Sequence, residues 1–253
     1  MNRCKGARHV MSKWKKTRVL WKKAELRSNI PETRKMTRET LKEMLNRYQM
    51  VYVKPDVGTY GNGVMRVEMK ENGGGYRYQN GLKVRSFTSF DPMFESIRKH
   101  TRRRRYLVQK GIHLTRYRKR RFDIRVMVQQ SPKRKWEATG VIGRVGDPRK
   151  VVTNVHNGGK ITPIETLLAA YMPDKQKRVF VSRLKKLGTM AAKQLHRQFR
   201  GIKEIGLDVA LDRQLHPWVL EANTCPDPYI FNKLKDKRIF GKIARYARAY
   251  GRI

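Results

Sequence analysis

The fold is decided by the stretch Gly206-Leu-Asp-Val-Ala-Leu-Asp-Arg-Gln-Leu-His-Pro-Trp-Val-Leu-Glu-Ala-Asn223, in which two apolar runs flank a polar turn. Alternating apolar residues and β-branched side chains make both runs strands, so the stretch predicts an antiparallel hairpin. If Leu211 pairs with Trp218, Asp208 lies opposite Glu221, and directly opposed residues share one face of a sheet. The hairpin therefore predicts two carboxylates side by side.

These two carboxylates predict a bound cation. Asn223 lies two residues after Glu221, so its amide points to the same face of the strand. Opposed like charges repel unless a cation lies between them, and Mg²⁺ prefers a few carboxylates plus substrate phosphates. The alternative is a surface hairpin with solvated acids. Because the chain has 20 Asp and Glu against 60 Lys and Arg, two acids and an Asn on one apolar face favour metal binding by Asp208, Glu221 and Asn223.

Composition bounds the class of protein. The 253 residues, 39% hydrophobic, suffice for one large domain or two small ones with a real core. A net charge of +40 attracts polyanions, which include nucleic acid, anionic polymers, membrane surfaces and nucleotides, and it specifies none of them. Cys4 and Cys225 form no metal-binding spacing and no disulfide framework, so a reducing cytoplasm is expected. No stretch approaches membrane-spanning length.

A glycine-rich loop follows the apolar strand predicted over residues 50–54. The order is strand, Pro55-Asp-Val-Gly-Thr-Tyr-Gly-Asn-Gly63, strand. It lacks the Gly-Lys-Ser/Thr of a P-loop, and no helix follows it as in a dinucleotide fingerprint. Backbone N–H groups of a glycine hairpin can cover phosphates, and Lys54 can reach the same phosphates as a point charge. The alternative is an ordinary turn.

Basic residues gather in the middle of the chain. Residues 98–121 contain twelve Lys or Arg and no acid. They form either solvated loops around a buried strand or an anion-binding surface, and the sequence does not separate these two. In the next strand, Asp123 and Arg125 lie on one face, and an Arg inside a strand needs a partner, which predicts an anion for Arg125. Asn154 precedes a double glycine, which suggests a shaped loop close to a ligand.

The remaining patterns complete an α+β chain. Apolar periodicity predicts helices over residues 37–48, 91–100, 173–199 and 231–250. Alternation and turn residues predict strands over residues 64–69, 76–79, 82–85, 106–112 and 136–145.

Six motifs in this order resemble the ATP-grasp enzymes, and among them the YheC/YheD-like family, described as endospore coat-associated. The motifs are Lys54-Pro with Gly58-Thr-Tyr-Gly-Asn-Gly63, Val108-Gln-Lys-Gly-Ile112, Phe122-Asp-Ile-Arg125, Asn154-Val-His-Asn-Gly-Gly159, Gly206-Leu-Asp208 and Glu221-Ala-Asn223. The resemblance covers roughly residues 12–250.

The resemblance implies that two α+β subdomains with antiparallel sheets grip ATP. It implies a basic lead over residues 1–34, a lid subdomain over 35–105 and a C-terminal subdomain with the metal site over 106–253. Family members usually carry a further domain ahead of this core, so that N-terminal domain is expected to be largely missing. Because it often shapes the acceptor site, substrate recognition is left open.

The resemblance also implies the residues that hold ATP and Mg²⁺. The nucleotide phosphates would lie against Lys54 under a loop that includes Gly58, Thr59, Gly61, Asn62 and Gly63. The adenine would be framed by the backbone of Gln109, Lys110 and Ile112. The transferred phosphate would contact Arg125, so Lys54 and Arg125 are the expected catalytic residues, and Asp208, Glu221 and Asn223 would hold Mg²⁺. Lys13 matches a second phosphate lysine only loosely.

The implied reaction is ATP-dependent ligation. A carboxylate becomes an acylphosphate, and an amine or similar nucleophile then attacks it. Related glutamate-adding enzymes have an Arg at the position of Val152, and many relatives have Gly at the position of Asp227, so the acceptor is left open, with an anionic polymer or peptide as one candidate. Two alternatives remain: a non-catalytic, coat-associated protein that binds polyanions on this scaffold, and a nucleic-acid-binding protein. The last has no recognisable motif here, although the charge permits it.

Overall fold

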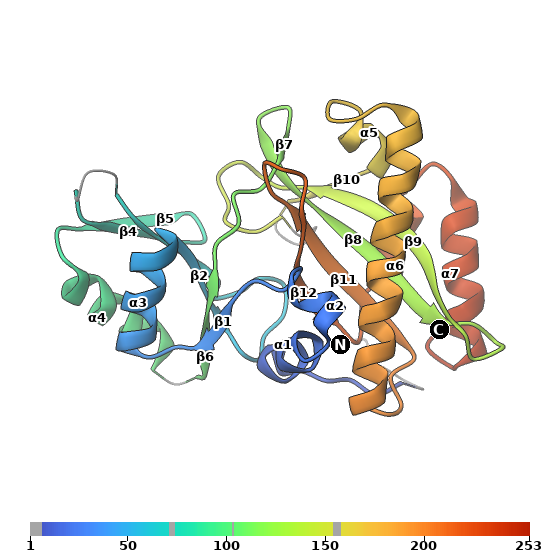
Figure 1. Cartoon of the computed structure of the whole chain (residues 1–253), viewed down its shortest axis with the longest axis horizontal. Helices are drawn as coiled ribbons and strands as arrows, with labels where there is room; N and C mark the ends of the chain where they lie inside the picture. Colours follow the sequence, from blue (N-terminus) through green and yellow to red (C-terminus); the bar gives the residue numbers. More distant parts are fainter. Residues whose placement is uncertain (1–6, 71–73, 103, 154–157) are drawn as a thin grey trace.

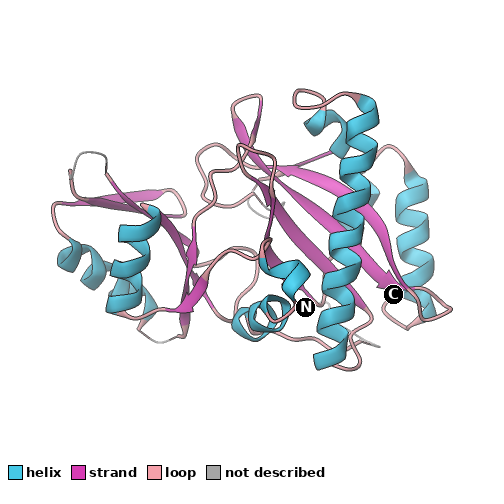
Figure 2. Cartoon of the chain, viewed as in Figure 1, coloured by secondary structure: helices cyan, strands magenta, loops and turns pink. Residues whose placement is uncertain are grey.

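The computed structural model describes residues 7–70, 74–102, 104–153 and 158–253. These residues form two antiparallel sheets of six strands each, which lie side by side with helices packed on them (Figure 1; Figure 2). The predicted α+β class is confirmed.

The first sheet has the strand order β1-β6-β2-β3-β4-β5. Its strands are β1 (Thr33–Lys35), β2 (Met50–Pro55), β3 (Met65–Met69), β4 (Tyr76–Asn80), β5 (Lys83–Phe87) and β6 (Tyr106–Lys110). Helices α3 (Arg38–Tyr48) and α4 (Phe90–Thr101) cover one face, where Leu41, Met44 and Leu45 pack against Val51 and Val53 of β2. Because side chains alternate along a strand, Met50, Tyr52 and Lys54 point to the opposite face, toward the second sheet.

The second sheet has the order β10-β9-β8-β11-β12, with β7 paired to β8. Its strands are β7 (Arg116–Tyr117), β8 (Arg120–Gln130), β9 (Trp136–Val145), β10 (Lys160–Thr162), β11 (Glu204–Leu211) and β12 (Pro217–Asn223). The 25-residue helix α6 (Asp174–Gln198) crosses one face (Figure 1). A Cβ at Gly188 would lie 2.9 Å from Val128 Cγ2, so glycine lets α6 approach the sheet closely.

The other face of the second sheet is covered near the C-terminus. The 3₁₀ turn η3 (Tyr229–Lys233) and helix α7 (Lys237–Ala249) pack there through Phe231 and Ile243. One continuous helix was predicted over residues 231–250. The structure breaks it, because Asp236 caps a new helix by accepting a hydrogen bond from Arg238 N. The short helix α5 (Ile164–Leu168) packs on the same face of the second sheet as α6.

The first helices, α1 (Lys13–Trp21) and α2 (Ala24–Arg27), pack on the second sheet. Val19, Leu20 and Leu26 belong to the same hydrophobic core as α6 and β11. Val219 N of β12 donates to Asn29 O at 2.7 Å. This packing places one face of α1 against the strand that carries Glu221.

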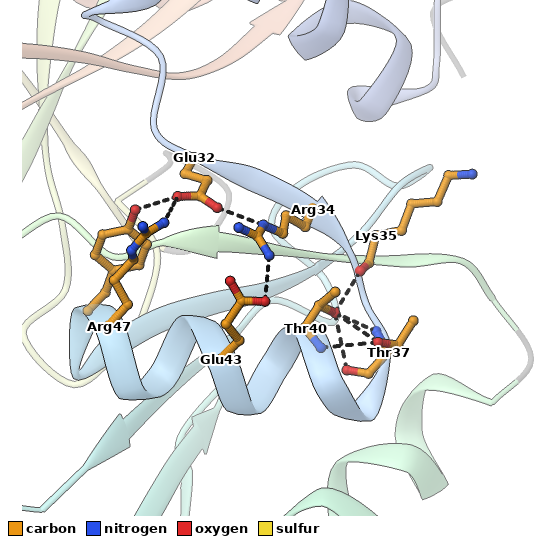
Figure 3. A network of polar contacts seen from close by, with 8 residues as sticks. Glu32, Arg34, Lys35, Thr37, Thr40, Glu43 and Arg47 are labelled. Carbon is orange, nitrogen blue, oxygen red and sulfur yellow. Dashed lines mark hydrogen bonds and ion pairs between the residues drawn. The ribbon is translucent and has the colours of Figure 1, made fainter.

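A polar network connects the start of β1, in the first sheet, to α3 (Figure 3). Glu32 accepts hydrogen bonds from Arg34, Arg47 and Tyr48, and Arg34 also pairs with Glu43. Thr37 and Thr40 cap α3 reciprocally, which confirms the predicted helix start (Figure 3). Glu32 O also accepts from Lys110 N at 2.8 Å, so the network fixes the end of β6.

Two sequence expectations are corrected. Leu211 pairs with Pro217 rather than with Trp218, because a β-bulge shifts the register near the turn. Cys225 is disulfide-bonded, so the expectation of no disulfide is wrong; Cys4 lies outside the described residues. No helix in the described ranges is both long and apolar enough to cross a bilayer.

Candidate active site

The β11–β12 hairpin brings the predicted metal ligands together. Asp208 pairs with Glu221, and Gly206 pairs with Asn223, as the face argument requires. Asn223 Nδ2 lies 3.5 Å from Asp208 Oδ2. Asp208 still pairs with Glu221, although the register near the turn differs from the prediction by one residue. The bulge accounts for this, because Leu220 is an extra residue between Val219 and Glu221.

The bulge also supplies an acceptor to the facing sheet. Leu220 O accepts a hydrogen bond from Lys54 Nζ at 3.0 Å. Lys54 Nζ also donates to Gln109 Oε1 at 2.8 Å, and Gln109 Nε2 donates to Thr33 Oγ1. Burial lowers the pKa of Lys54 to about 8, so this ammonium is held by dipoles rather than by a contacting carboxylate. Lys54 therefore connects the two sheets at the candidate site.

Two further lysines on α1 reach the same place. Lys13 Nζ lies 3.4 Å from Glu221 Oε1 and donates to Gly58 O at 2.9 Å. Lys16, one turn later, is 3% exposed, and burial lowers its pKa to about 8 against the opposing charges of Glu221 and Asp56. The structure thus places Lys13, which matched a phosphate-binding lysine only loosely in sequence, beside Glu221 and the glycine loop. Lys16 was missed, because a Lys-rich helix does not reveal which lysine faces inward.

Asp208 lies in a buried network of ion pairs across three strands. Arg125 Nη2 lies 3.1 Å from Asp208 Oδ2, and Arg144 Nη2 lies 3.0 Å from the same oxygen. Arg144 Nε donates to Asp123 Oδ1 at 2.8 Å. Burial alone would raise the pKa of Asp208, but the charges of Arg125 and Arg144 outweigh it and hold the pKa below its usual value. Arg144 was not predicted, since only the strand register pairs it with Asp123.

Gly206 makes room for Arg125. A Cβ at this position would lie 2.8 Å from Arg125 Nη1 and 2.8 Å from Pro226 Cβ. The guanidinium therefore crosses β11 directly over the glycine and meets Asp208 with two hydrogen bonds. The anion predicted for Arg125 is, in this structure, the carboxylate of Asp208.

The glycine loop connects β2 and β3 beside these lysines. The structure ties its first glycine, Gly58, to Lys13. The rest of the loop turns on itself, with Asn62 N donating to Thr59 O and with positive φ at Gly61 and Gly63. Thr59 and Asn62 are exposed at its tip. The sequence placed this loop next to Lys54, and the structure places its base there.

The predicted adenine frame lies along the end of β6. Gln109 is buried against Lys54, whereas Lys110 Nζ lies over the Tyr48 and Trp218 rings, 5.2 and 4.6 Å from their centroids. Ile112 is buried and lines a cavity of about 380 Å³ between the two sheets. Asn154 lies outside the described residues.

The oxygen donors fit a magnesium ion that also takes phosphate oxygens. Within the described ranges, no cluster of three or more His, Cys, Asp or Glu side chains is placed to hold a metal. Asp208 and Glu221 supply two carboxylates, and Asn223 supplies an amide. Mg²⁺ is commonly bound by one or two carboxylates together with substrate phosphates, so two acids suffice if a nucleotide provides the rest.

Comparison with known sequences identifies the relatives of this chain. The model of the YheC/D-like ATP-grasp family matches residues 5–253. The chain is 28% identical over 200 residues to the endospore coat-associated protein YheD of Bacillus subtilis strain 168 and 23% identical over 225 residues to YheC of the same organism. These matches cover 77% and 87% of the chain but only 43% and 61% of the relatives. The chain therefore spans about half the length of the curated relatives it matches.

Comparison with solved structures confirms the fold. An N5-carboxyaminoimidazole ribonucleotide synthetase in complex with ADP superposes with a TM-score of 0.55 at 12% identity, covering 94% of this chain and 51% of that one. The ATP-grasp ligase PsnB in complex with a minimal precursor gives a TM-score of 0.51 at 15% identity, covering 93% and 60%. At these identities the likeness establishes the arrangement of the two sheets alone.

Proposed function

This chain belongs to the YheC/D-like ATP-grasp family, and from that premise we propose that it is an ATP- and Mg²⁺-dependent ligase that joins a carboxylate to an amine or similar nucleophile. One observation carries the proposal. Three buried lysines, Lys13, Lys16 and Lys54, converge from two different parts of the chain on the hairpin that holds Asp208 and Glu221. Such a cluster of cations beside paired acids suits a triphosphate with its metal.

The lysines would bind the phosphates of ATP. Lys54 and Lys16 are buried, so each gains a strong interaction when a phosphate replaces lost hydration. The loop from Gly58 to Gly63 would cover the phosphates with backbone N–H groups. Residues 35–105, together with strand β6 of the same sheet, would thus act as the lid over the rest of residues 106–253. The segment Gln109–Ile112 would frame the adenine, and Asn154 would lie in a neighbouring loop.

Asp208, Glu221 and Asn223 would hold Mg²⁺. When bound, the ion neutralises charge on the phosphate oxygens during transfer. In this structure both oxygens of Asp208 accept hydrogen bonds from guanidinium groups. Arg125 would therefore divide its hydrogen bonds between Asp208 and the transferred phosphate, while Arg144 keeps Asp208 ionised and oriented.

The proposed chemistry has two steps. A carboxylate oxygen attacks the γ-phosphorus, the bond from that phosphorus to the β-phosphate oxygen breaks, and ADP leaves. An amine then attacks the acyl carbon, phosphate leaves with the electrons of the acyl C–O bond, and the departing phosphate takes up the proton that the amine loses. Neither step requires a side-chain nucleophile. Positioning and charge neutralisation supply the rate.

The acceptor is proposed to be an anionic polymer or peptide. The basis is the net charge of +40, which concentrates polyanions at the surface. The same charge supports a second candidate function, a coat-associated protein that binds polyanions without catalysis. We propose spore association, because both curated relatives are named endospore coat-associated proteins. The expectation of a reducing cytoplasm rested on the absence of a disulfide, and the disulfide of Cys225 removes that basis.

Calorimetry with MgATP tests the ligase proposal. The unmodified chain is expected to bind MgATP, and Glu221→Ala is expected to lose this binding, because the variant removes one of two carboxylates. Glu95→Ala, which removes an exposed acid on α4, serves as the matched control and is expected to bind normally. Equal binding by Glu221→Ala and Glu95→Ala would remove the metal assignment. Binding of anionic polymers by a chain that does not bind MgATP would favour the second candidate.

A further inference from the structure

The cavity of about 380 Å³ lies at the other end of the inward face of β2 from Lys54. Met50 and Tyr52 form one wall, and the segment from Ile112 to Arg116 forms another. Four arginines line it: Arg66, Arg116, Arg121 and Arg213. None of the described residues in this lining is acidic, and none is Lys13, Lys16 or Lys54. We call it the arginine cavity.

Two of these guanidinium groups have buried nitrogens without partners. Within the part of the chain that the structure describes, Arg66 Nε and Arg121 Nη1 are shielded from solvent and make no hydrogen bond. Arg66 already has a carboxylate partner, because its Nη2 pairs with Glu68 on the same strand. Its Nε is nevertheless unused. Burying a donor without an acceptor is costly, so such groups usually have a ligand or a catalytic reason.

The four arginines line one cavity together with Tyr52 and His113. The positive charges of Arg66 and Arg121 both act on the phenol of Tyr52, whose pKa burial raises. Burial lowers the pKa of His113, and the charges of Arg66 and Arg213 lower it further. Tyr52 and Arg66 are paired residues of β2 and β3, so they share one face of the first sheet. The charge of Glu68, which pairs with Arg66, opposes this lowering of the pKa of His113.

We propose that the arginine cavity is a binding subsite for a phosphate-type oxyanion, separate from the lysines that face Glu221. A guanidinium presents a planar fork of donors that matches phosphate with two hydrogen bonds, and four arginines line this cavity with no acid in its described lining. Met50, Ile112 and Leu114 add an apolar wall. The ligand is therefore a phosphate group carried on an apolar or flat moiety. The inference does not depend on ligase activity.

The phosphate has two conceivable sources, which one pair of titrations distinguishes. It is carried on the ribose of the nucleotide, or it belongs to a separate phosphorylated molecule. In the first case, adenosine 3′,5′-bisphosphate binds more tightly than AMP, and Arg121→Gln removes the difference. In the second case, inorganic pyrophosphate binds to a chain already saturated with ADP, and Arg121→Gln removes that binding. If neither occurs, the proposal is overturned.

The first experiment is calorimetry with inorganic pyrophosphate on the full chain at fixed salt. We expect two sites. Lys54→Met weakens one, and Arg121→Gln weakens the other by about tenfold, as expected for the loss of a hydrogen bond to a charged group. Arg102→Gln, an exposed arginine at the end of α4 that changes the net charge by the same amount, is the control and leaves both sites within about twofold.

The outcomes separate this proposal from the proposed function. If the chain fails to bind ATP, pyrophosphate binding to Lys54→Met still reports the arginine cavity. If Arg121→Gln and Arg102→Gln bind pyrophosphate alike, the subsite does not exist. If Arg121→Gln weakens ATP but the unmodified chain has only the Lys54-dependent pyrophosphate site, the arginines contact the base, and the proposal is wrong. Melting temperatures of Arg121→Gln and Arg102→Gln equal to that of the unmodified chain establish that the variants are folded.

Discussion

The two ends of the inward face of β2 hold positive charge in different ways. At one end, Lys54 donates to Leu220 O and Gln109 Oε1, and the acids Glu221 and Asp208 lie near enough to act on its charge. At the other end, the arginine cavity has no acid in its described lining and leaves two guanidinium nitrogens unpaired. At the first end, the chain's own acceptors hold the lysine that is proposed to meet ATP. At the second end, Arg66 pairs with Glu68, and we propose that the remaining guanidinium donors take an anion from outside.

The largest expected effect concerns stability. Arg144→Met leaves the buried carboxylate of Asp123 without its arginine partner, and it removes one of the two guanidinium groups that pair with Asp208. The free energy of unfolding should therefore fall by about 3 kcal/mol. Arg121→Met removes an arginine without such a partner and should change that free energy by less than about 0.5 kcal/mol. Urea denaturation of both variants measures the difference. Equal losses would mean that the arginine cavity is balanced internally after all.

The next effect concerns nucleotide binding. Lys54→Met removes the ammonium that donates to Gln109 and Leu220 and that would donate to a phosphate. The substitution should weaken the binding of MgATP about 100-fold. Calorimetry measures the affinity, with Lys70→Met, an exposed lysine at the end of β3, as the matched control. Unchanged affinity in Lys54→Met would place the phosphates elsewhere, and the arginine cavity would become the first place to look.

A smaller effect follows from the low pKa values of two lysines. Lys16 and Lys54, with pKa values of about 8, are charged below pH 8 and lose their protons as the pH rises through 8. Metal-free ADP should therefore bind about tenfold more weakly at pH 9 than at pH 7, and binding near pH 8 should take up protons. Calorimetry in two buffers of different ionisation enthalpy measures both quantities.

The same two pKa values fix a stability trend. Because the unfolded chain keeps protons on these lysines up to about pH 10.5, it binds more protons than the folded chain between pH 8 and 10.5. Their contribution to the free energy of unfolding therefore rises with pH across that window. No such dependence is expected from the arginine cavity, since guanidinium groups keep their charge. A pH-independent affinity for ADP would show that the two lysines do not contact the phosphates.

The smallest effect lies within the arginine cavity. Arg116 is exposed at its rim, whereas Arg121 is partly buried with a shielded nitrogen. Because exposed charges are screened by solvent and salt, Arg116→Gln should weaken pyrophosphate by only about twofold. The same titration that tests Arg121→Gln measures it. A larger loss in Arg116→Gln would move the binding position outward to the rim.

The sequence predicted elements that depend on local pattern. Alternation in the two strands was enough to place Asp208 opposite Glu221, and Thr37 was correctly recognised as a helix cap. Lys16 and Arg144 could not be predicted, because the inward face of α1 and the register of β9 depend on packing between distant segments. Likewise, the twelve basic residues of 98–121 look alike in sequence, and only the meeting of the two sheets turns Arg121 inward.

The bulge at Leu220 has a consequence for how this site tolerates change. The oxygen that accepts the hydrogen bond from Lys54 Nζ belongs to the main chain, so any amino acid at position 220 presents it. Replacing side chains one at a time would leave this contact intact and would not detect it. Deleting Leu220 would remove the extra residue and draw β12 into continuous register, which would take the carbonyl away from Lys54. The hydrogen bond that connects the two sheets thus depends on the number of residues in β12 rather than on which side chains they carry.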